Sequence, residues 1–239
     1  MLGAQQIYRR NSVKERHKVN SDKISDYQGE DATQYESQAV EVAWHGHEIL
    51  FGLMYEFIKP EETLLDIGIG TGLSSFLFQQ AGLQISGFDN SAEMLEGCKA
   101  KGFSGEIIRH DLRNVPFPYQ TASCNHVISL AVLNFFADPA PVFKEAARII
   151  KPKGVFGFTV EGKKPGQESQ YTICVKSGSG QDKELFEIAM YRHSDEHVRA
   201  LLESVGFFVR KDFEFLADRY PEQGIEVYLK VYIAQKGCA

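Results

Sequence analysis

The sequence has no long apolar run and no apolar leader. No uncharged apolar run approaches the roughly 20 residues that a membrane-spanning helix needs. A secretory signal segment is not expected either, because charged residues arrive by Arg9 and continue from there. These absences argue against a membrane protein, and we expect a cytoplasmic one.

Cysteine is also scarce, and acidic residues outnumber basic ones. The 239 residues include four cysteines without CxxC spacing, which argues against a zinc site or a disulfide framework. The formal net charge of -6 argues against general affinity for nucleic acid or for an anionic membrane, because both depend on clustered Lys and Arg. One basic cluster lies between Arg9 and Lys18, and a solvated terminus explains it more simply than a binding patch. We therefore expect no metal, no nucleic-acid partner and no membrane partner, whereas the oligomeric state stays open.

The first two thirds of the chain alternate between strand and helix signals. Apolar residues at helical spacing predict one helix between Ala39 and Ile58, which Pro60 ends. Later helices are predicted to begin near Leu73, Ser91 and Pro141. The predicted strands cover residues 63–67, 84–88, 106–109, 126–130 and 155–160. Largely apolar strands separated by helices imply a parallel sheet that is covered on both faces.

The last third has a different pattern. Tyr171–Lys176 and Leu185–Tyr191 predict an inserted hairpin, and a helix is predicted from Ser194 to Ser204. Two final β segments, at 207–216 and 225–235, predict an antiparallel pair. The predicted fold class is therefore α/β, with a seven-stranded, mostly parallel sheet flanked by helices, an N-terminal helical cap and a β-hairpin insertion at about 163–193. We expect residues 1–38 to form an arm or lid and residues 39–239 to form the main domain.

The strongest functional signal is a glycine-rich turn, Gly68-x-Gly70-x-Gly72, which follows an apolar strand containing Asp66. Glycines allow the backbone to approach a ligand closely, and Asp89 ends the next predicted strand, where a carboxylate can accept hydrogen bonds from ribose. The dinucleotide fingerprint GxGxxG would place its third glycine at position 73, which is Leu73. A nucleotide-binding turn is therefore predicted, and the alternative is a packing turn with a solvent-facing Asp89.

The segment LLDIGIGTG resembles the first motif of the Rossmann-like (class I) S-adenosylmethionine-dependent methyltransferases. Further segments resemble later motifs of this family in the same order, namely FDNSAEML, RHDLRNVPFP, VISLAVLNFF and ARIIKPKGVFGF. The resemblance implies S-adenosylmethionine as cofactor. It implies cofactor contacts at Asp66, Gly68, Gly70, Gly72, Asp89, Asn90, Met94, Asp111, Leu112, Leu130 and Ala131.

Two departures from the family pattern concern the fourth motif. Asn125 stands where the family usually has Asp, and we expect this position only to open the strand. The [D/N]PP[Y/F] signature of DNA amino-methyltransferases is absent, and Asn134-Phe135-Phe136 occupies its place. We therefore expect a small-molecule methyl acceptor.

The residues that would face the acceptor are harder to assign. Trp44, with Tyr27 and Tyr35, could hold the positive sulfonium against an aromatic ring, but Trp44 could equally belong to the core. His193 is the candidate catalytic base, against the alternative of a structural, hydrogen-bonded histidine. Two other functions stay open, namely a non-catalytic S-adenosylmethionine-binding or regulatory protein and a nicotinamide-dependent oxidoreductase.

Overall fold

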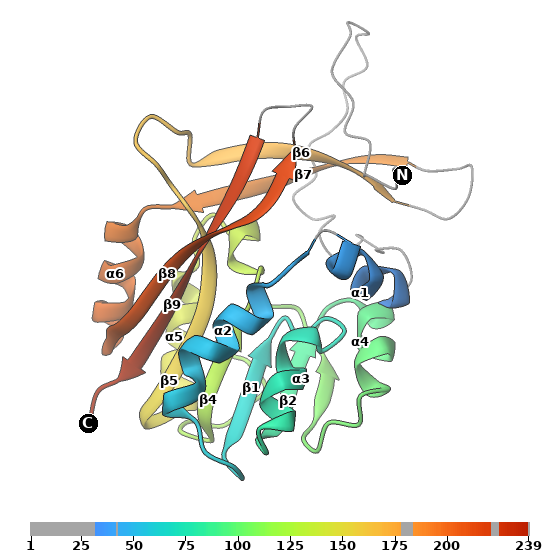
Figure 1. Ribbon diagram of the computed structural model, residues 1–239. Coiled ribbons are helices and arrows are strands. Elements are labelled where there is room, and N and C mark those ends of the chain that lie inside the picture. The colour runs from blue at the N-terminus through green and yellow to red at the C-terminus, as the bar shows by residue number, and fades with distance from the viewer. Residues whose placement is uncertain (1–31, 42, 178–183, 221–224, 239) are drawn as a thin grey trace, which may run out of the picture.

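The computed structural model describes residues 32–41, 43–177, 184–220 and 225–238, and in these ranges a central sheet lies between layers of helices (Figure 1). Most of the predicted arm, including Tyr27, lies outside the described residues. The division at residue 38 therefore stays a prediction, although helix α1 (Ala32–Glu41) runs across it.

Seven strands form the predicted sheet in the order β3-β2-β1-β4-β5-β9-β8. Strand β9 runs antiparallel to both of its neighbours, and the other strands are parallel to one another, so the predicted sheet is confirmed. The bounds are β1 Thr63–Ile67, β2 Gln84–Asp89, β3 Ile107–Arg109, β4 Cys124–Ser129, β5 Ile150–Gly162, β8 Phe207–Tyr220 and β9 Ile225–Lys236.

Each face of the sheet has its own apolar core. Consecutive strand residues point to opposite faces, so Val127 belongs to one core and Ile128 to the other. Helices α5 (Ala140–Ile149) and α6 (Asp195–Ser204) cover the first core. The second core is covered by α2 Gly46–Met54, α3 Leu73–Gln80 and α4 Ala92–Lys99.

Two helix starts follow from their capping residues. The Oγ of Ser91 accepts a hydrogen bond from the backbone N–H of Met94 at 3.2 Å, and Ser194 does the same for His197 at 3.2 Å. Each cap satisfies a backbone donor that the helix itself leaves unpaired. Both predicted helix starts are therefore confirmed.

The single helix predicted between Ala39 and Ile58 is wrong. The chain instead forms α1, then α2, then the short helix η2 (Tyr55–Phe57). Ala43, just before α2, has a left-handed φ of 52°, which an α-helix does not allow. The ring of Trp44 then lies against Gly46, where a Cβ atom would stand 2.4 Å from it. The chain therefore bends between α1 and α2.

The inserted hairpin is present as β6 (Gln170–Ser177) and β7 (Glu184–His193). Strand β7 joins the sheet by pairing with the end of β5, at Glu161↔Arg192 and Gly162↔His193. Because β9 already occupies the other side of β5, β7 lies on the β4 side, beyond the end of β4. The hairpin therefore crosses above the carboxyl edge of the sheet, as Figure 1 shows.

Candidate functional site

The three glycines of the turn have different surroundings. Gly68, Gly70 and Gly72 all have positive φ, at 76°, 54° and 83°. A Cβ atom on Gly72 would lie 2.5 Å from the ring of Phe103, whereas one on Gly70 would meet nothing within 4 Å. Packing within the protein therefore explains the absence of a side chain at Gly72, and Gly70 is the position that leaves open space.

Asp89 connects this turn to the next helix. One carboxylate oxygen accepts a hydrogen bond from the backbone N–H of Gly70 at 3.0 Å, and the other accepts one from that of Ser91 at 2.9 Å. Burial raises the pKa of Asp89, although the backbone N–H groups of Ser91 and Gly70 oppose the shift. A carboxylate has about four lone-pair positions, so both oxygens can still accept further hydrogen bonds from a diol.

Asp66 lies deeper, at the end of β1. Its side chain is 1% exposed, and one oxygen accepts a hydrogen bond from the hydroxyl of Ser75 at 2.7 Å. Burial raises the pKa of Asp66 to about 7, and the nearby charge of Asp89 adds to this effect. Among the described residues, its other oxygen and the hydroxyl of Thr71 are buried without a hydrogen-bond partner. Buried polar atoms of this kind are uncommon and mark a place where a ligand or water is expected.

Asp111 and Leu112 lie in the loop that follows β3. Arg113 donates to both carboxylate oxygens of Asp111, at 3.0 Å from Nε and 2.7 Å from Nη2, and it lowers the pKa of Asp111. Leu112 is buried in the first core. His110 Nε2 lies 2.7 Å from the backbone oxygen of Asn114, which orients this loop.

Leu130 and Ala131 follow β4 at the same edge of the sheet. Ala131 has a left-handed φ of 57°, and its N–H donates to the hydroxyl of Thr159 on β5 at 2.8 Å. This bond fixes the turn after β4, and Leu130 packs into the second core. Thr159 was not predicted, because its partner lies 28 residues earlier in the chain.

Asn125 has a structural role at the opposite edge of the sheet. Its side-chain oxygen accepts hydrogen bonds from the hydroxyl of Thr63 at 2.9 Å and from the ammonium of Lys151 at 3.0 Å. It thereby connects the starts of β1 and β4, far from the glycine turn.

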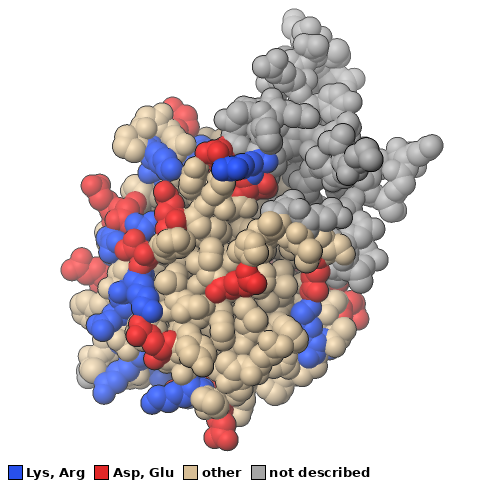
Figure 2. Space-filling model, viewed as in Figure 1, with Lys and Arg blue, Asp and Glu red and all other residues tan. Residues whose placement is uncertain are grey.

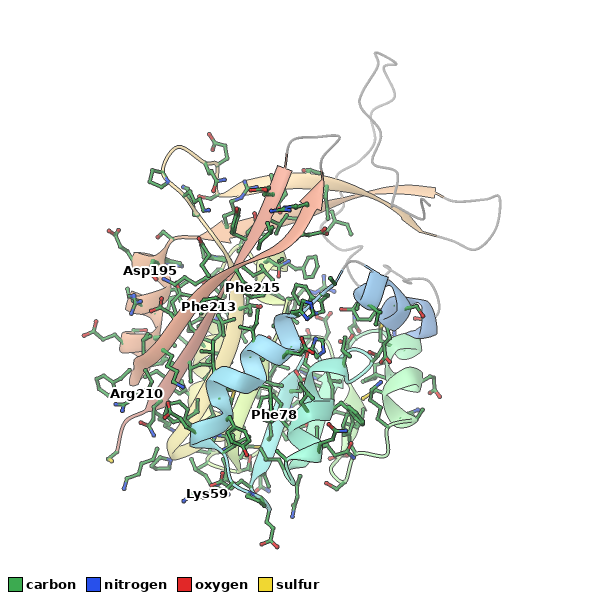
Figure 3. All side chains as sticks on the ribbon, in the orientation of Figure 1. Lys59, Phe78, Asp195, Arg210, Phe213 and Phe215 are labelled. Atoms are coloured by element: carbon green, nitrogen blue, oxygen red, sulfur yellow. The ribbon has the colours of Figure 1, made fainter. Side chains whose placement is uncertain are left out.

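Trp44 is half-buried against the second core. Its ring lies 5.9 Å from that of Phe215, which extends from β8 toward α2 (Figure 3). Ala131 packs against the same core, so Trp44 and the turn after β4 share one apolar cluster. Tyr35, on α1, is exposed.

His193 lies where the hairpin joins the sheet. Its side chain is 4% exposed, and Nε2 lies 3.4 Å from the backbone oxygen of Leu133 in the short helix η3 (Leu133–Phe135). Burial lowers the pKa of His193, so the imidazole is neutral at pH 7. In the same helix, the side-chain oxygen of Asn134 is also buried without a partner among the described residues. These polar groups lie under the hairpin, beside the turn that carries Leu130 and Ala131.

A buried ion pair that the sequence did not predict holds the hairpin to β5. Arg192 donates to Glu161 at 2.7 Å, and the hydroxyl of Tyr171 donates to the other carboxylate oxygen at 2.6 Å. The guanidinium also lies 3.8 Å from the centre of the Tyr171 ring. These contacts join β5, β6 and β7.

The visible charges mix both signs. In Figure 2, Lys and Arg alternate with Asp and Glu along the β8 side of the molecule, and the surface over α2 and α3 is mostly uncharged. Part of this mixture is a network in which Asp195 and Asp212 each pair with Arg199 and Lys230. This face therefore presents no continuous basic surface.

The described residues contain no helix that is long and apolar enough to cross a membrane. They also contain no group of three or more His, Cys, Asp or Glu side chains arranged to hold a metal ion.

Comparison with known proteins identifies the domain. Residues 65–158 match a family model described as a methyltransferase domain. The demethylmenaquinone methyltransferase of Thermotoga maritima is 33% identical over 99 residues, which are 41% of this chain and 42% of that protein. The chain thus matches less than half the length of this curated relative.

Solved structures extend the likeness to most of the fold. A methyltransferase described as S-adenosylmethionine-dependent, from Methanosarcina mazei, is 17% identical, with a TM-score of 0.63 over 78% of this chain and 98% of that one. The [4+2]-cyclase SpnF is 16% identical, with a TM-score of 0.61 over 81% of both chains. At these identities the likeness establishes the fold. The chain therefore contains a methyltransferase domain at residues 65–158, and its fold is the Rossmann-like fold of these solved S-adenosylmethionine-dependent methyltransferases.

Proposed function

We propose that this protein transfers a methyl group from S-adenosylmethionine to a small-molecule acceptor. The observation that carries the proposal is the open space at Gly70, together with the hydrogen bond that the backbone N–H of Gly70 donates to Asp89. The unpartnered oxygens of Asp66 and Thr71 beside this turn fit a ligand that brings hydrogen-bonding groups. The cofactor supplies a methyl group on a positively charged sulfur, which a nucleophile can attack.

In this proposal the chain holds the cofactor along the carboxyl edge of β1, β2 and β4. Asp89 accepts hydrogen bonds from the ribose hydroxyls, and the backbone at Gly70 leaves room for the rest of the molecule. The buried carboxyl group of Asp66, beneath the glycine turn, offers its unpartnered oxygen to the cofactor. The remaining proposed contacts are Gly68, Gly72, Asn90, Met94, Asp111, Leu112, Leu130, Ala131 and Trp44.

The hairpin is the proposed wall of the acceptor site. Ile188 and Met190 on β7 form a small buried cluster with Phe135 of η3, next to the turn after β4. An apolar wall here would exclude water from the reacting atoms and would fix their approach, which is the main contribution that a protein makes to this displacement. The name of one relative, demethylmenaquinone methyltransferase, agrees with a small-molecule acceptor.

His193 is the proposed general base. It would take the proton from the methyl-accepting atom of the substrate when that atom carries one. A neutral imidazole can take a proton, and burial keeps His193 neutral at pH 7. His193→Ala should lower the rate of methyl transfer without changing the affinity for S-adenosylhomocysteine. A purely structural histidine would instead be rescued by His193→Gln, which restores a hydrogen-bonding side chain but cannot act as a base near neutrality.

Two alternatives define the experiment. The fold likeness to a cyclase means that a bound cofactor alone does not establish methyl transfer, so a non-catalytic S-adenosylmethionine-binding protein must be tested against. The nicotinamide-dependent oxidoreductase is disfavoured by Leu73, which stands where the dinucleotide motif has its third glycine.

The purified protein should be incubated with methyl-labelled S-adenosylmethionine and a metabolite extract, and small-molecule products should be separated by liquid chromatography. We expect label in a small molecule, and no label with Gly70→Val, whose side chain fills the open space. Binding of S-adenosylhomocysteine without any labelled product would favour the non-catalytic alternative. Preferential binding of NAD would contradict the cofactor assignment.

A further inference from the structure

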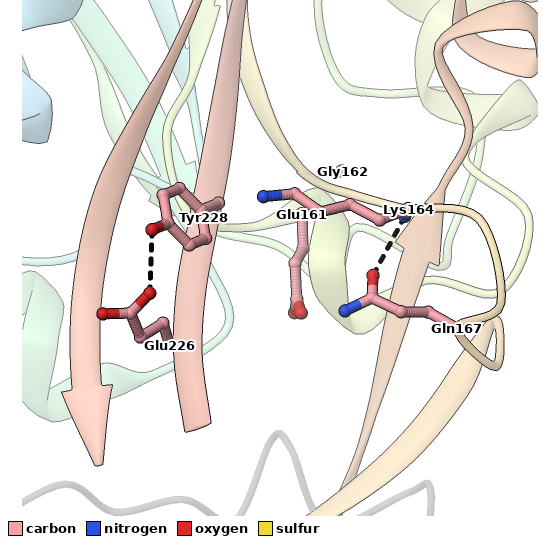
Figure 4. Close-up of a pocket in the computed structure, with 6 residues that line it drawn as sticks. All are labelled: Glu161, Gly162, Lys164, Gln167, Glu226 and Tyr228. Atoms are coloured by element: carbon pink, nitrogen blue, oxygen red, sulfur yellow. Dashed lines mark hydrogen bonds between the residues drawn. The ribbon is translucent and has the colours of Figure 1, made fainter. Parts of the chain in front are cut away.

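A separate pocket opens on the β9 side of the end of β5, away from the glycine turn. Its volume is about 310 Å³, within the range of small-ligand sites. The lining residues are Glu161, Gly162, Lys164, Gln167, Glu226 and Tyr228 (Figure 4). They come from the end of β5 with the loop that follows it and from β9, so two segments distant in sequence form the pocket.

The chain's own ammonium group already occupies part of this pocket. Lys164 Nζ lies 3.8 Å from the centre of the Tyr228 ring and 3.6 Å from a carboxylate oxygen of Glu214 on β8. An aromatic face with a nearby carboxylate is the arrangement that proteins use to bind ammonium groups. Figure 4 shows the lysine side chain reaching from its loop across to the ring.

The aromatic ring has a contact that does not involve the lysine. The hydroxyl of Tyr228 donates to Glu226 at 2.8 Å, which orients the ring. The carboxylate of Glu214 lies close to the main chain of β5, so that a Cβ on Gly162 would stand 3.3 Å from it. Departure of the lysine would therefore leave the oriented ring in place, with the Glu214 carboxylate near the same pocket.

The lysine can leave easily. Its side chain is 45% exposed, and its pairing with Glu214, itself 41% exposed, is a surface ion pair. Such pairs contribute little net stability, because water solvates both partners when they separate. The backbone N–H of Lys164 donates to Gln167 at 2.9 Å, which holds the main chain of this loop while the side chain moves.

We propose that this pocket binds a small organic ammonium ion, and that Lys164 occupies the seat on Tyr228 when the ligand is absent. Glu161 is paired with Arg192 and Glu226 with Arg219, so the negative charge that displacement of the lysine exposes is that of Glu214, beside the ring of Tyr228. The inference goes beyond methyl transfer and does not depend on it.

Titration calorimetry with choline tests the proposal. Its carbon analogue, dimethylbutanol, has the same shape without the charge and serves as the neutral probe. We expect choline to bind at least several-fold more tightly than dimethylbutanol. Lys164→Met should strengthen choline binding several-fold, because it removes the internal competitor.

Matched variants separate this site from general charge effects. Lys163→Met removes the neighbouring charge, whose ammonium bonds Ser169 instead, and should leave choline binding unchanged. Tyr228→Phe keeps the aromatic face and should retain binding, whereas Tyr228→Leu should abolish it. A folded Tyr228→Leu that binds choline like the wild type would overturn the proposal. So would equal affinity for the two probes, or failure of both the wild type and Lys164→Met to bind choline.

Discussion

Asp89 is the residue on which the proposed ribose site depends most. Its carboxylate bonds the backbone of Gly70 on one side and that of Ser91 on the other, so one side chain fixes both walls of the site. Asp111 differs from it, because Arg113 already donates to both of its oxygens. The two acidic residues should therefore contribute unequally to cofactor affinity.

Asp89→Ala should weaken S-adenosylhomocysteine binding by one to several orders of magnitude. Hydrogen bonds to a charged group contribute about 1.5–3 kcal/mol each, and about 1.4 kcal/mol corresponds to a tenfold change in affinity. Asp111→Ala should cost less. Calorimetric titration of both variants measures the difference, and an unchanged affinity in Asp89→Ala would show that the ribose lies elsewhere.

Asp66→Asn should stabilise the ligand-free protein, and more so as the pH rises. The pKa of Asp66 is about 7 in the folded protein and near its ordinary 3.8 in the unfolded chain. The unfolded state therefore loses this proton first, and stability is lost as the pH rises from about 4 to 7. At about 1.4 kcal/mol per pKa unit, the full effect is on the order of 4 kcal/mol.

Urea unfolding of the wild type and Asp66→Asn at pH 5 and pH 8 measures this difference. Ser75→Ala is the matched variant, because loss of its hydroxyl removes a hydrogen bond that favours the charged carboxyl. It should destabilise the protein more at pH 8 than at pH 5. If Asp66→Asn had the same effect at both pH values, the carboxyl would not titrate between them.

At the scale of the elements, the hairpin depends on one buried ion pair. The side chains of Glu161 and Arg192 are 4% and 14% exposed, and Tyr171 bonds the same carboxylate. Removal of one partner of such a pair leaves an uncompensated buried charge, at a cost of roughly 3–5 kcal/mol. The cost should fall mainly on the hairpin, because the only core strand that takes part in these contacts is β5, through Glu161 near its end.

Arg192→Gln should therefore speed hydrogen exchange in β6 and β7 and leave β1 and β4 protected. Glu161→Gln should do the same, and the double variant should lose less than the sum of the two single changes. Arg199→Gln is the control, because its partners are exposed. Equal loosening of β1 and β4 would show that the pair supports the whole domain.

Element positions were largely predictable from the sequence, whereas side-chain contacts were not. Strand β1 has the predicted bounds, because it is an apolar run that ends at the glycine turn, and helix α3 begins at the predicted Leu73. Strand β5 is longer than the predicted 155–160, because it begins at Ile150, before Pro152, and ends at Gly162. The break between α1 and α2 was missed, because apolar spacing continues across it while the backbone at Ala43 does not.

The candidate site was only partly predictable for the same reason. Motif spacing located the glycine turn and Asp89 at one edge of the sheet, because parallel strands bring their ends together. It did not show that Asp66 is buried on Ser75, nor that Glu161 pairs with Arg192, 31 residues away. Such contacts depend on how distant elements pack, which periodicity does not encode.

For the whole molecule, cofactor binding should appear as thermal stability. A ligand that binds only the folded state adds about 2.7 kcal/mol at a concentration 100 times its dissociation constant. For a domain of this size that corresponds to a rise of several degrees in Tm, at about 2–4 °C per kcal/mol. S-adenosylhomocysteine should give this rise, and NAD should not. Gly70→Val should show no rise, and a full rise in that variant would place the ligand outside the glycine turn.

The two ends of the inserted hairpin are neighbours in space, since Gly162 and His193 are paired across β5 and β7. A short turn between them could replace the insertion without rerouting any other segment of the chain. The inserted segment can thus be exchanged as a unit, because it joins the sheet at β5 whereas the glycine turn follows β1. Grafting a different hairpin at this junction would change the proposed wall of the acceptor site while the glycine turn kept its own geometry, so residues 162 and 193 are the positions at which to join a new segment.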